Sequence, residues 1–191
     1  MVGTDAGGVE RDLAGGRITC PGCGGGLRPW GFARWRVLRE RAWERRVRPR
    51  RSRCGSCLVT HVLLPTIALL RRRDVAAVIG EALRARHLDG ASRRAVAAGA
   101  GVHPDTARGW LRRFVTRAED IRVAFSSLAH RLDAQLGPIE PRGSPSADAL
   151  EAIGVAAGAA TRRLGPAPLW EFVAGASGGR LLSNTSCPLP R

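Results

Sequence analysis

The stretch from Cys20 to Cys57 reads CPGCGGGLRPWGFARWRVLRERAWERRVRPRRSRCGSC. It begins with the pair Cys20-Pro-Gly-Cys23 and ends with the pair Cys54-Gly-Ser-Cys57, and 30 residues separate the two pairs. Two residues between cysteines form a tight knuckle, in which a glycine supplies the sharp backbone turn, and each knuckle directs two thiolates at one metal ion. The sequence therefore predicts a structural Zn²⁺ ion with four sulfur ligands: Cys20, Cys23, Cys54 and Cys57.

Other roles fit these cysteines less well. A redox dithiol is typically one C-x-x-C pair beside a βαβ pattern, and neither pair has that setting. His61 follows the second pair and is an alternative fourth ligand, whereas Cys187 is isolated near the C-terminus and is expected to be a free thiol. Four thiolates leave no open position for water, so we expect the metal to support folding rather than catalysis.

Arginine is concentrated in the same stretch. Ten arginines lie between residues 34 and 53, and six of them fall within residues 45–53. The chain carries a formal net charge of +15, and most of the excess lies in its first two thirds. A localised cationic field suits a polyanion, because phosphates relieve the repulsion among the arginines. We expect phosphate contacts from Arg48, Arg50 and Arg51; a solvated strand face is the alternative.

Aromatic residues are interleaved with these arginines. The segment Phe32-Ala33-Arg34-Trp35-Arg36-Val37 alternates apolar and charged residues, which predicts a strand with one solvated face in a short β-hairpin sheet. The tryptophans are expected to pack into a small core, and stacking on single-stranded bases is the alternative. These tryptophans are Trp30, Trp35 and Trp43.

A helical pattern begins after Pro65. Apolar residues recur there at helical spacing until Asp89-Gly90, beginning with Ile67 and Leu70. Ser92 is suited to cap a second helix through its hydroxyl oxygen, and Pro104 is suited to the first position of a third.

The segment Ser92–Phe114 reads SRRAVAAGAGVHPDTARGWLRRF and fits a helix-turn-helix. That motif needs a small residue where two helices cross, a glycine in the turn and apolar residues that close the angle. Ala97 and Gly101 meet the first two needs, and an ordinary helical hairpin is the alternative. The apolar set consists of Val96, Ala100, Val102, Ala107 and Trp110.

In this register the third helix presents a polar outer face, whose first turn and middle would face base edges in the major groove. Arg108 is expected to read a base, and Arg112 and Arg113 to contact base or phosphate. Asp105 either accepts a hydrogen bond from a cytosine amino group or complements the helix dipole. The full set of expected DNA contacts in this motif is Arg93, Arg94, Asp105, Thr106, Arg108, Gly109, Arg112 and Arg113.

The rest of the chain is less specific. One apolar stripe continues from Trp110 through Ile121, Phe125, Leu128 and Leu132, and it either pairs two copies of the chain or packs on the first helix. We expect a mainly α fold with a small β zinc ribbon and a helix-turn-helix bundle. The expected segments are a disordered N-terminus (1–17), the zinc ribbon (18–64), the helix-turn-helix domain (65–136), a linker (137–145), a short helical segment (146–174) and a tail (175–191).

These two modules resemble those of a known group of proteins. The C-P-x-C and C-x-x-C ribbon, the Arg-rich second strand, the junction His61-Val62-Leu63-Leu64-Pro65 and the helix-turn-helix are similar to the N-terminal DNA-binding end of insertion-sequence transposases. They are more similar to small actinobacterial proteins of unknown function that have the same pair of modules, and whose tails resemble residues 179–185. The resemblance covers about residues 18–117, and it implies a zinc-dependent DNA-binding function.

The leading hypothesis is a sequence-specific DNA-binding protein, either a transcriptional regulator or a mobile-element accessory, that binds double-stranded DNA. The alternatives are a zinc-ribbon protein-interaction adaptor and a non-catalytic transposase remnant. We expect no enzyme activity and no small-molecule substrate, because the chain shows no paired carboxylates or histidine cluster and is too short for a transposase catalytic domain. No signal peptide and no apolar run of about 20 residues is visible, so we expect a cytoplasmic, nucleoid-associated protein without a membrane partner. A homodimer is left open.

Overall fold

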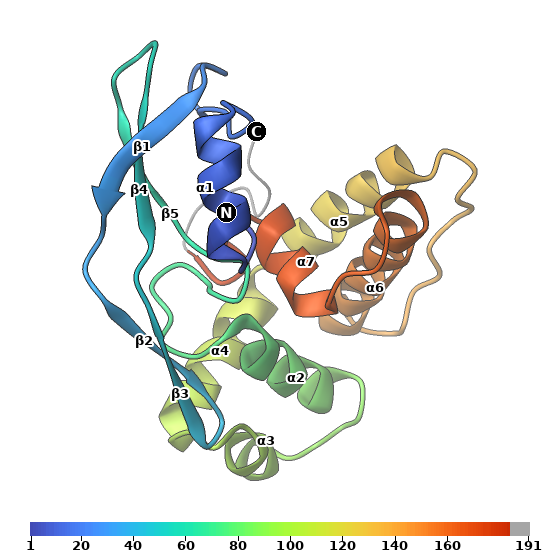
Figure 1. The fold of residues 1–191 in the computed structure, drawn as a ribbon. Coiled ribbons are helices and arrows are strands. Elements are labelled where there is room, and N and C mark those ends of the chain that lie inside the picture. Colours follow the sequence, from blue (N-terminus) through green and yellow to red (C-terminus); the bar gives the residue numbers. More distant parts are fainter. Residues whose placement is uncertain (184–191) are drawn as a thin grey trace.

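The computed structural model describes residues 1–183 and shows a mixed fold, with strands along one side and most helices along the other (Figure 1). The strands are β1 (Leu27–Phe32), β2 (Arg36–Glu40), β3 (Trp43–Val47), β4 (Arg50–Cys54) and β5 (Thr60–Leu63). The helices are α1 (Ala6–Ala14), α2 (Ala76–His87), α3 (Arg93–Ala100), α4 (Pro104–Thr116), α5 (Ala118–Leu132), α6 (Pro145–Leu164) and α7 (Leu169–Ala176). The coarse prediction of helices joined to a small β region is confirmed.

The strands form one long twisted ribbon. Strand β4 pairs antiparallel with both β1 and β5, and β2 pairs antiparallel with β3. Between the two sheets, the Ala33 N–H donates to the Pro49 carbonyl at 2.8 Å. Residues 27–54 therefore form a continuous hairpin whose far turn contains Arg41 in the left-handed conformation, with φ 55°. The predicted hairpin between the two cysteine pairs is confirmed.

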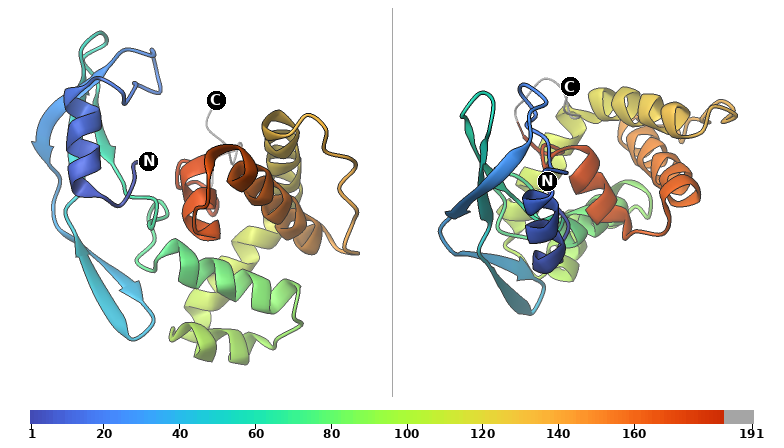
Figure 2. Two further views of the ribbon diagram at one scale, coloured as in Figure 1. Left: turned by 45° about the vertical axis from the view of Figure 1, so that its right-hand side comes forward. Right: turned by 45° about the horizontal axis from the view of Figure 1, so that its top comes forward.

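Helix α1 corrects the prediction that residues 1–17 are disordered. The Asp5 carboxylate caps this helix by accepting hydrogen bonds from the backbone N–H groups of Gly7 and Gly8. Val9 and Leu13 lie one helical turn apart and are buried against the ribbon. They pack beside Leu27 and the two buried cysteines, Cys20 and Cys54. Both views in Figure 2 place α1 next to the strands. A cap and two apolar residues suffice here because the ribbon supplies the surface on which they pack.

The first predicted helix begins later than expected. Residues from Pro65 to Asp74 form turns and short bridges, so Ile67 and Leu70 are not helical. The Ala76 N–H donates to the Ile67 carbonyl at 2.8 Å, which folds this segment back onto the start of α2. Helical spacing of apolar residues is also produced by a compact turn that buries the same side chains.

Helices α2–α7 share one hydrophobic cluster. Within it, α5 packs along α6, so the stripe that contains Ile121 and Phe125 is covered by α6. Neither expected arrangement of this stripe includes α6 as its partner, and pairing with a second copy stays a prediction. The segment from residue 146 is helical, as expected, and α6 extends over 20 residues and contributes to the same core.

The predicted tail is partly ordered. Leu181 and Leu182 are buried in the helical cluster, and the Arg117 guanidinium donates to the carbonyls of Arg180 and Ser183 at 3.1 and 2.6 Å. The tail therefore belongs to the core at least as far as Ser183. Cys187 and the end of the segment that carries the tail resemblance lie outside the described residues. Among residues 1–183, no helix is long and apolar enough to cross a membrane.

The ribbon is attached to the helices through β2. Leu38 is buried in the helical cluster, and the Arg39 guanidinium forms an ion pair with Asp74 at 3.0 Å. Backbone hydrogen bonds link Arg39 to Arg73 and Val75 at 2.6 and 3.0 Å. The segment predicted as one zinc ribbon thus contributes to two cores: β1, β4 and β5 pack with α1, while β2 and β3 pack with the helices.

Candidate metal centre and nucleic-acid interface

The four predicted zinc ligands come together. Their Sγ atoms all lie within 4.8 Å of one another, with Cys20 and Cys54 buried and Cys23 and Cys57 exposed. The Sγ atoms of Cys20 and Cys57 are 3.7 Å apart, and those of Cys23 and Cys54 are 3.4 Å apart. A tetrahedron of sulfurs about 2.3 Å from a central ion has edges of about 3.8 Å. The cluster therefore has the ligand type and spacing needed to hold a metal ion.

The ribbon positions this cluster through its backbone. Cys20 precedes β1 and Cys54 ends β4, so the pairing of these strands brings the two knuckles to one end of the sheet. The Gly24 N–H donates to the Cys20 carbonyl at 2.9 Å and closes the first knuckle. A Cβ atom at Gly25 would lie 2.5 Å from Ser56 Oγ and 3.1 Å from Cys54 Sγ. The close approach of the two knuckles thus requires a residue without a side chain there.

The thiols differ in acidity when no metal neutralises them. Backbone N–H groups of Cys57 and Ser56 donate to Cys54 and lower the pKa of this thiol to about 6. The Val59 N–H lowers the pKa of Cys57, but hydrogen bonds from neighbouring thiols, Cys23 first, and burial outweigh it and raise that pKa to about 11. Crowded sulfurs resist carrying several negative charges, and a bound cation would remove that resistance.

His61 lies beside the cluster on β5. Its Nε2 atom is 3.4 Å from Cys20 Sγ, so the histidine flagged as an alternative ligand is close enough to hydrogen-bond with a ligand. Ligand thiolates are commonly oriented by such neighbours. The four cysteines form a complete set without it.

Helices α3 and α4 are joined by a tight turn. The Ser92 hydroxyl accepts a hydrogen bond from the Ala95 N–H at 3.2 Å, and Pro104 begins α4, as predicted. Gly101 ends α3 in the left-handed conformation, with φ 65° and ψ 36°, which favours glycine. Ala97 is buried where the helices approach each other, and Ala107 and Trp110 are buried on the inner face of α4.

The opposite face of α4 is polar and open. Arg108 and Arg112 are exposed, while Arg113 is partly covered and donates to the Gly109 carbonyl at 2.9 Å. Arg108 forms an ion pair with Asp105 at 2.9 Å, so Asp105 orients the arginine that was expected to read a base. The remaining predicted contacts of this motif are exposed or partly exposed: Arg93, Arg94, Thr106 and Gly109.

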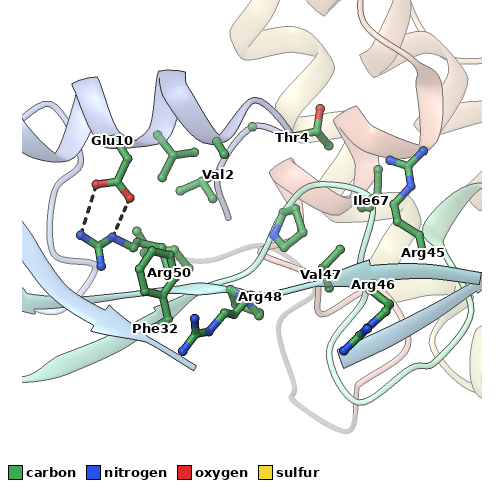
Figure 3. A pocket seen from close by; sticks show the side chains of 16 residues that line it. Val2, Thr4, Glu10, Phe32, Arg45, Arg46, Val47, Arg48, Arg50 and Ile67 are labelled. Atoms are coloured by element: carbon green, nitrogen blue, oxygen red, sulfur yellow. Dashed lines mark hydrogen bonds and ion pairs between the residues drawn. The ribbon is translucent and has the colours of Figure 1, made fainter. Parts of the chain in front are cut away.

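The three predicted ribbon contacts are not equivalent. Arg48 is exposed, and Arg51 is partly covered within β4. The Arg50 side chain is only 15% exposed, and its guanidinium pairs with Glu10 of α1 at 2.7 Å (Figure 3). Arg50 therefore links α1 to the ribbon, and Arg48 is the more accessible cation for a phosphate.

The prediction that the ribbon tryptophans form a small core is wrong. Trp30, Trp35 and Trp43 are all exposed, and Phe32 is exposed as well. The nearby core positions are taken instead by aliphatic residues, Leu27 in one cluster and Leu38 in the other. The alternation of aromatic residues and arginines therefore marks an exposed surface of the ribbon rather than a core.

Comparisons with protein-family models, with curated proteins and with solved structures found no match for this chain. The geometry of the cysteine cluster, of the α3–α4 pair and of the ribbon surface is thus the basis for inferring function.

Proposed function

We propose that this protein is a sequence-specific DNA-binding protein in which α3 and α4 form a helix-turn-helix and α4 reads the major groove. The observation that carries the proposal is the division of α4 into two faces. Ala107, Trp110 and Phe114 hold the helix on the core, whereas Arg108 and Arg112 point one turn apart on the open face. Arginine pairs bidentately with guanine in the major groove, so this face has suitable chemistry for reading bases.

The proposed metal is Zn²⁺, held by the four cysteines in a closed structural site. Thiolates select soft or borderline ions, and a four-sulfur tetrahedral set is typical of structural zinc in ribbons. The ion would fix the two knuckles against each other and so hold the arginine-rich strands in place. This role matches the resemblance to zinc-ribbon and helix-turn-helix proteins, including the DNA-binding end of transposases.

The placement of the basic hairpin supports a shared DNA interface. The turn between β2 and β3 approaches the turn between α3 and α4, since a Cβ at Gly101 would lie 3.9 Å from Arg41 Cα. Phosphate contacts from the exposed Arg41 at this turn would therefore fall near base contacts from α4. Phosphate contacts fix the register of a protein on DNA, and base contacts specify the sequence. A regulator or a mobile-element accessory without catalytic activity, acting on the nucleoid, fits this division.

The test is sequencing of genomic fragments captured by the purified, zinc-loaded protein at about 50 and 200 mM salt. A Gly109→Trp variant serves as the blocked form, because Gly109 lies on the open face of α4 and an added Cβ would meet only the flexible end of Arg113. We expect a defined sequence motif that persists at the higher salt and is lost in the variant. The folded state of the variant is checked by its thermal unfolding.

Capture that is broad, and that disappears at the higher salt, would contradict sequence-specific binding. It would mean that the arginines contact phosphates only. A motif that the Gly109→Trp variant still captures would contradict the role of α4. Either result, together with retained protein partners, would favour the adaptor hypothesis. An inverted repeat in the motif would indicate that two copies bind together.

A further inference from the structure

The ribbon carries a row of exposed aromatic rings, each with a guanidinium group above it. The Arg53 Cζ atom lies 4.8 Å from the centroid of the Trp30 ring, and Arg48 and Arg50 lie 5.0 and 4.4 Å from that of Phe32. Arg46 lies 5.1 Å from the Trp35 centroid. We name this row the aromatic–arginine stripe; it consists of Trp30, Phe32, Trp35, Arg46, Arg48, Arg50 and Arg53.

These rings are accessible rather than packed. Trp30, Phe32 and Trp35 are 51%, 49% and 56% exposed, and they follow one another along the first arm of the hairpin. Their arginines come from the opposite arm, in β3, β4 and the residues between them. Exposing three large rings in a row costs hydrophobic stabilisation that a purely structural ribbon would keep. The stripe therefore has the properties of a binding surface.

We propose that the aromatic–arginine stripe binds a single-stranded polynucleotide, with bases stacked on the rings and phosphates held by the arginines. Stacking accepts any base, because each has a π face, and a positively charged groove follows the backbone. The charge matches: Glu10 neutralises Arg50, and Arg46, Arg48 and Arg53 remain as cations of the stripe without a carboxylate partner among residues 1–183. This binding does not depend on α4 or on the proposed function.

The exposed faces of the rings favour a single strand over a duplex. Trp30 and Phe32 flank a bulge in β1, where Gly31 has φ 84° and the register with β4 shifts. Bases in duplex DNA are stacked at about 3.4 Å, and their faces are covered by neighbouring pairs. A ring can reach a base face only when the strand is unpaired and extended.

A cavity adjoins the middle of the stripe. It has a volume of about 310 Å³, and Phe32 lines it together with Arg46, Arg48 and Arg50 on one side and Val2 and Ile67 on the other. Figure 3 shows Arg45 and Arg46 leaving β3 to opposite sides, so that cationic groups flank the strand on both faces. A pocket with an apolar wall and a cationic rim suits one nucleotide, whose base is flat and whose phosphate is anionic.

The experiment measures binding of the full-length, zinc-loaded protein to labelled oligo(dT) and oligo(rU) of about 12 nucleotides and to a mixed-sequence duplex of the same length. We expect tighter binding of the single strands than of the duplex at about 150 mM salt. Binding of both single strands, or of only one, distinguishes a general single-strand surface from one that selects DNA or RNA through the 2′-hydroxyl. A preference for the duplex would overturn the proposal.

Tryptophan variants test the stacking itself. The double variant Trp30→Ala, Trp35→Ala should lose at least about 30-fold in affinity, because each stacked base contributes substantially. Trp43→Ala is the matched control, since Trp43 is exposed on the same hairpin but does not belong to the stripe. Trp30→Phe should keep most of the affinity while losing part of the quenching of tryptophan fluorescence by oligo(dT).

Two results would overturn the stacking proposal. One is unchanged affinity in the double alanine variant; the other is an equal loss in Trp43→Ala, which would indicate a general effect on the ribbon. Zinc content and thermal unfolding confirm that each variant is folded. The Gly109→Trp variant should bind oligo(dT) like the original chain, so failure of the helix-turn-helix proposal and failure of this one give different results.

Discussion

The two hydrophobic clusters of this protein differ in how far they can maintain structure alone. The helical cluster contains several fully buried large side chains, including Phe114, Phe125 and Ile121. The ribbon cluster consists of six buried residues, two of which are cysteines. Its aliphatic side chains contribute about 1.5–3 kcal/mol each, which is little against about 1–2 kcal/mol per residue of backbone entropy. A small sheet of this kind needs a cross-link, and the cysteine cluster supplies the ligands for one.

Removal of the proposed Zn²⁺ ion is the strongest test of this difference. Structural zinc contributes on the order of 10 kcal/mol in small domains, so chelation or Cys54→Ser should unfold the ribbon sheet and release α1. Helices α2–α7 should remain folded, because their hydrophobic cluster contains none of the four cysteines. Hydrogen exchange of each helix and strand measures the unfolding of the ribbon and the stability of α2–α7, and the content of bound zinc is measured in parallel.

His61→Ala is the control for this prediction. It removes a neighbour of Cys20 but no cysteine, so one equivalent of zinc should remain bound. Loss of zinc from His61→Ala would mean that the histidine is a ligand. Protection of β1 and β4 after complete removal of metal would contradict the proposed dependence of the ribbon on zinc.

Truncation of a side chain in the helical cluster should destabilise the helices without releasing the metal. Phe114 is fully buried, and its ring centroid lies 5.7 Å from that of His87. Phe114→Ala should lower the free energy of unfolding by about 3–5 kcal/mol, through lost burial and the cavity left behind. Thermal unfolding measures the effect, and the zinc content should not change. Val115→Ala, at an exposed neighbouring position, should be close to neutral.

A substitution in the Arg39–Asp74 ion pair, which links the ribbon to the helices, should have an intermediate effect on stability. The Asp74 side chain is only 4% exposed and is held by the Arg39 guanidinium at 3.0 Å. Asp74→Asn should destabilise the protein by about 1.5–3 kcal/mol, because a charged hydrogen bond is lost in a covered position. It should also increase hydrogen exchange in β2 and β3. Glu119→Gln disrupts an exposed ion pair with Arg122 at 2.6 Å and should leave the free energy of unfolding nearly unchanged, because solvent screens the pair.

The cysteine spacing and the capping residues could be interpreted from the sequence alone. A C-x-x-C pair folds into the same knuckle wherever it occurs, and Ser92, Gly101 and Pro104 act on their immediate neighbours. Local chemistry therefore predicted the cysteine cluster, both ends of α3 and the start of α4. The outer face of α4 followed from helical spacing once those boundaries were set.

The errors concern contacts between distant segments. Val9 and Leu13 could not be identified as core residues without the sheet that they cover, and the stripe on α5 gave no sign of α6 as its partner. Large rings are usually buried, which favours a core position for the ribbon tryptophans that the structure does not show. Periodicity shows which side chains share a face, but it does not show what that face contacts.

We expect the smallest effect on stability from substitution of a ring in the aromatic–arginine stripe, which is exposed, in contrast to the buried rings of the cores. Trp170 is buried against α2, where a Cβ at Gly80 would overlap its ring, and its Nε1–H donates to Glu81 at 2.8 Å. Trp30 instead projects from β1 with half of its surface open. Trp30→Ala should therefore change the free energy of unfolding by no more than about 0.5 kcal/mol. Denaturant unfolding of the zinc-loaded chain measures this, and a loss comparable to that of a core tryptophan would show that the ring stabilises the ribbon. If Trp30→Ala leaves stability unchanged but weakens oligonucleotide binding, the Trp30 ring contributes to binding and not to folding, as expected of a ligand-binding residue.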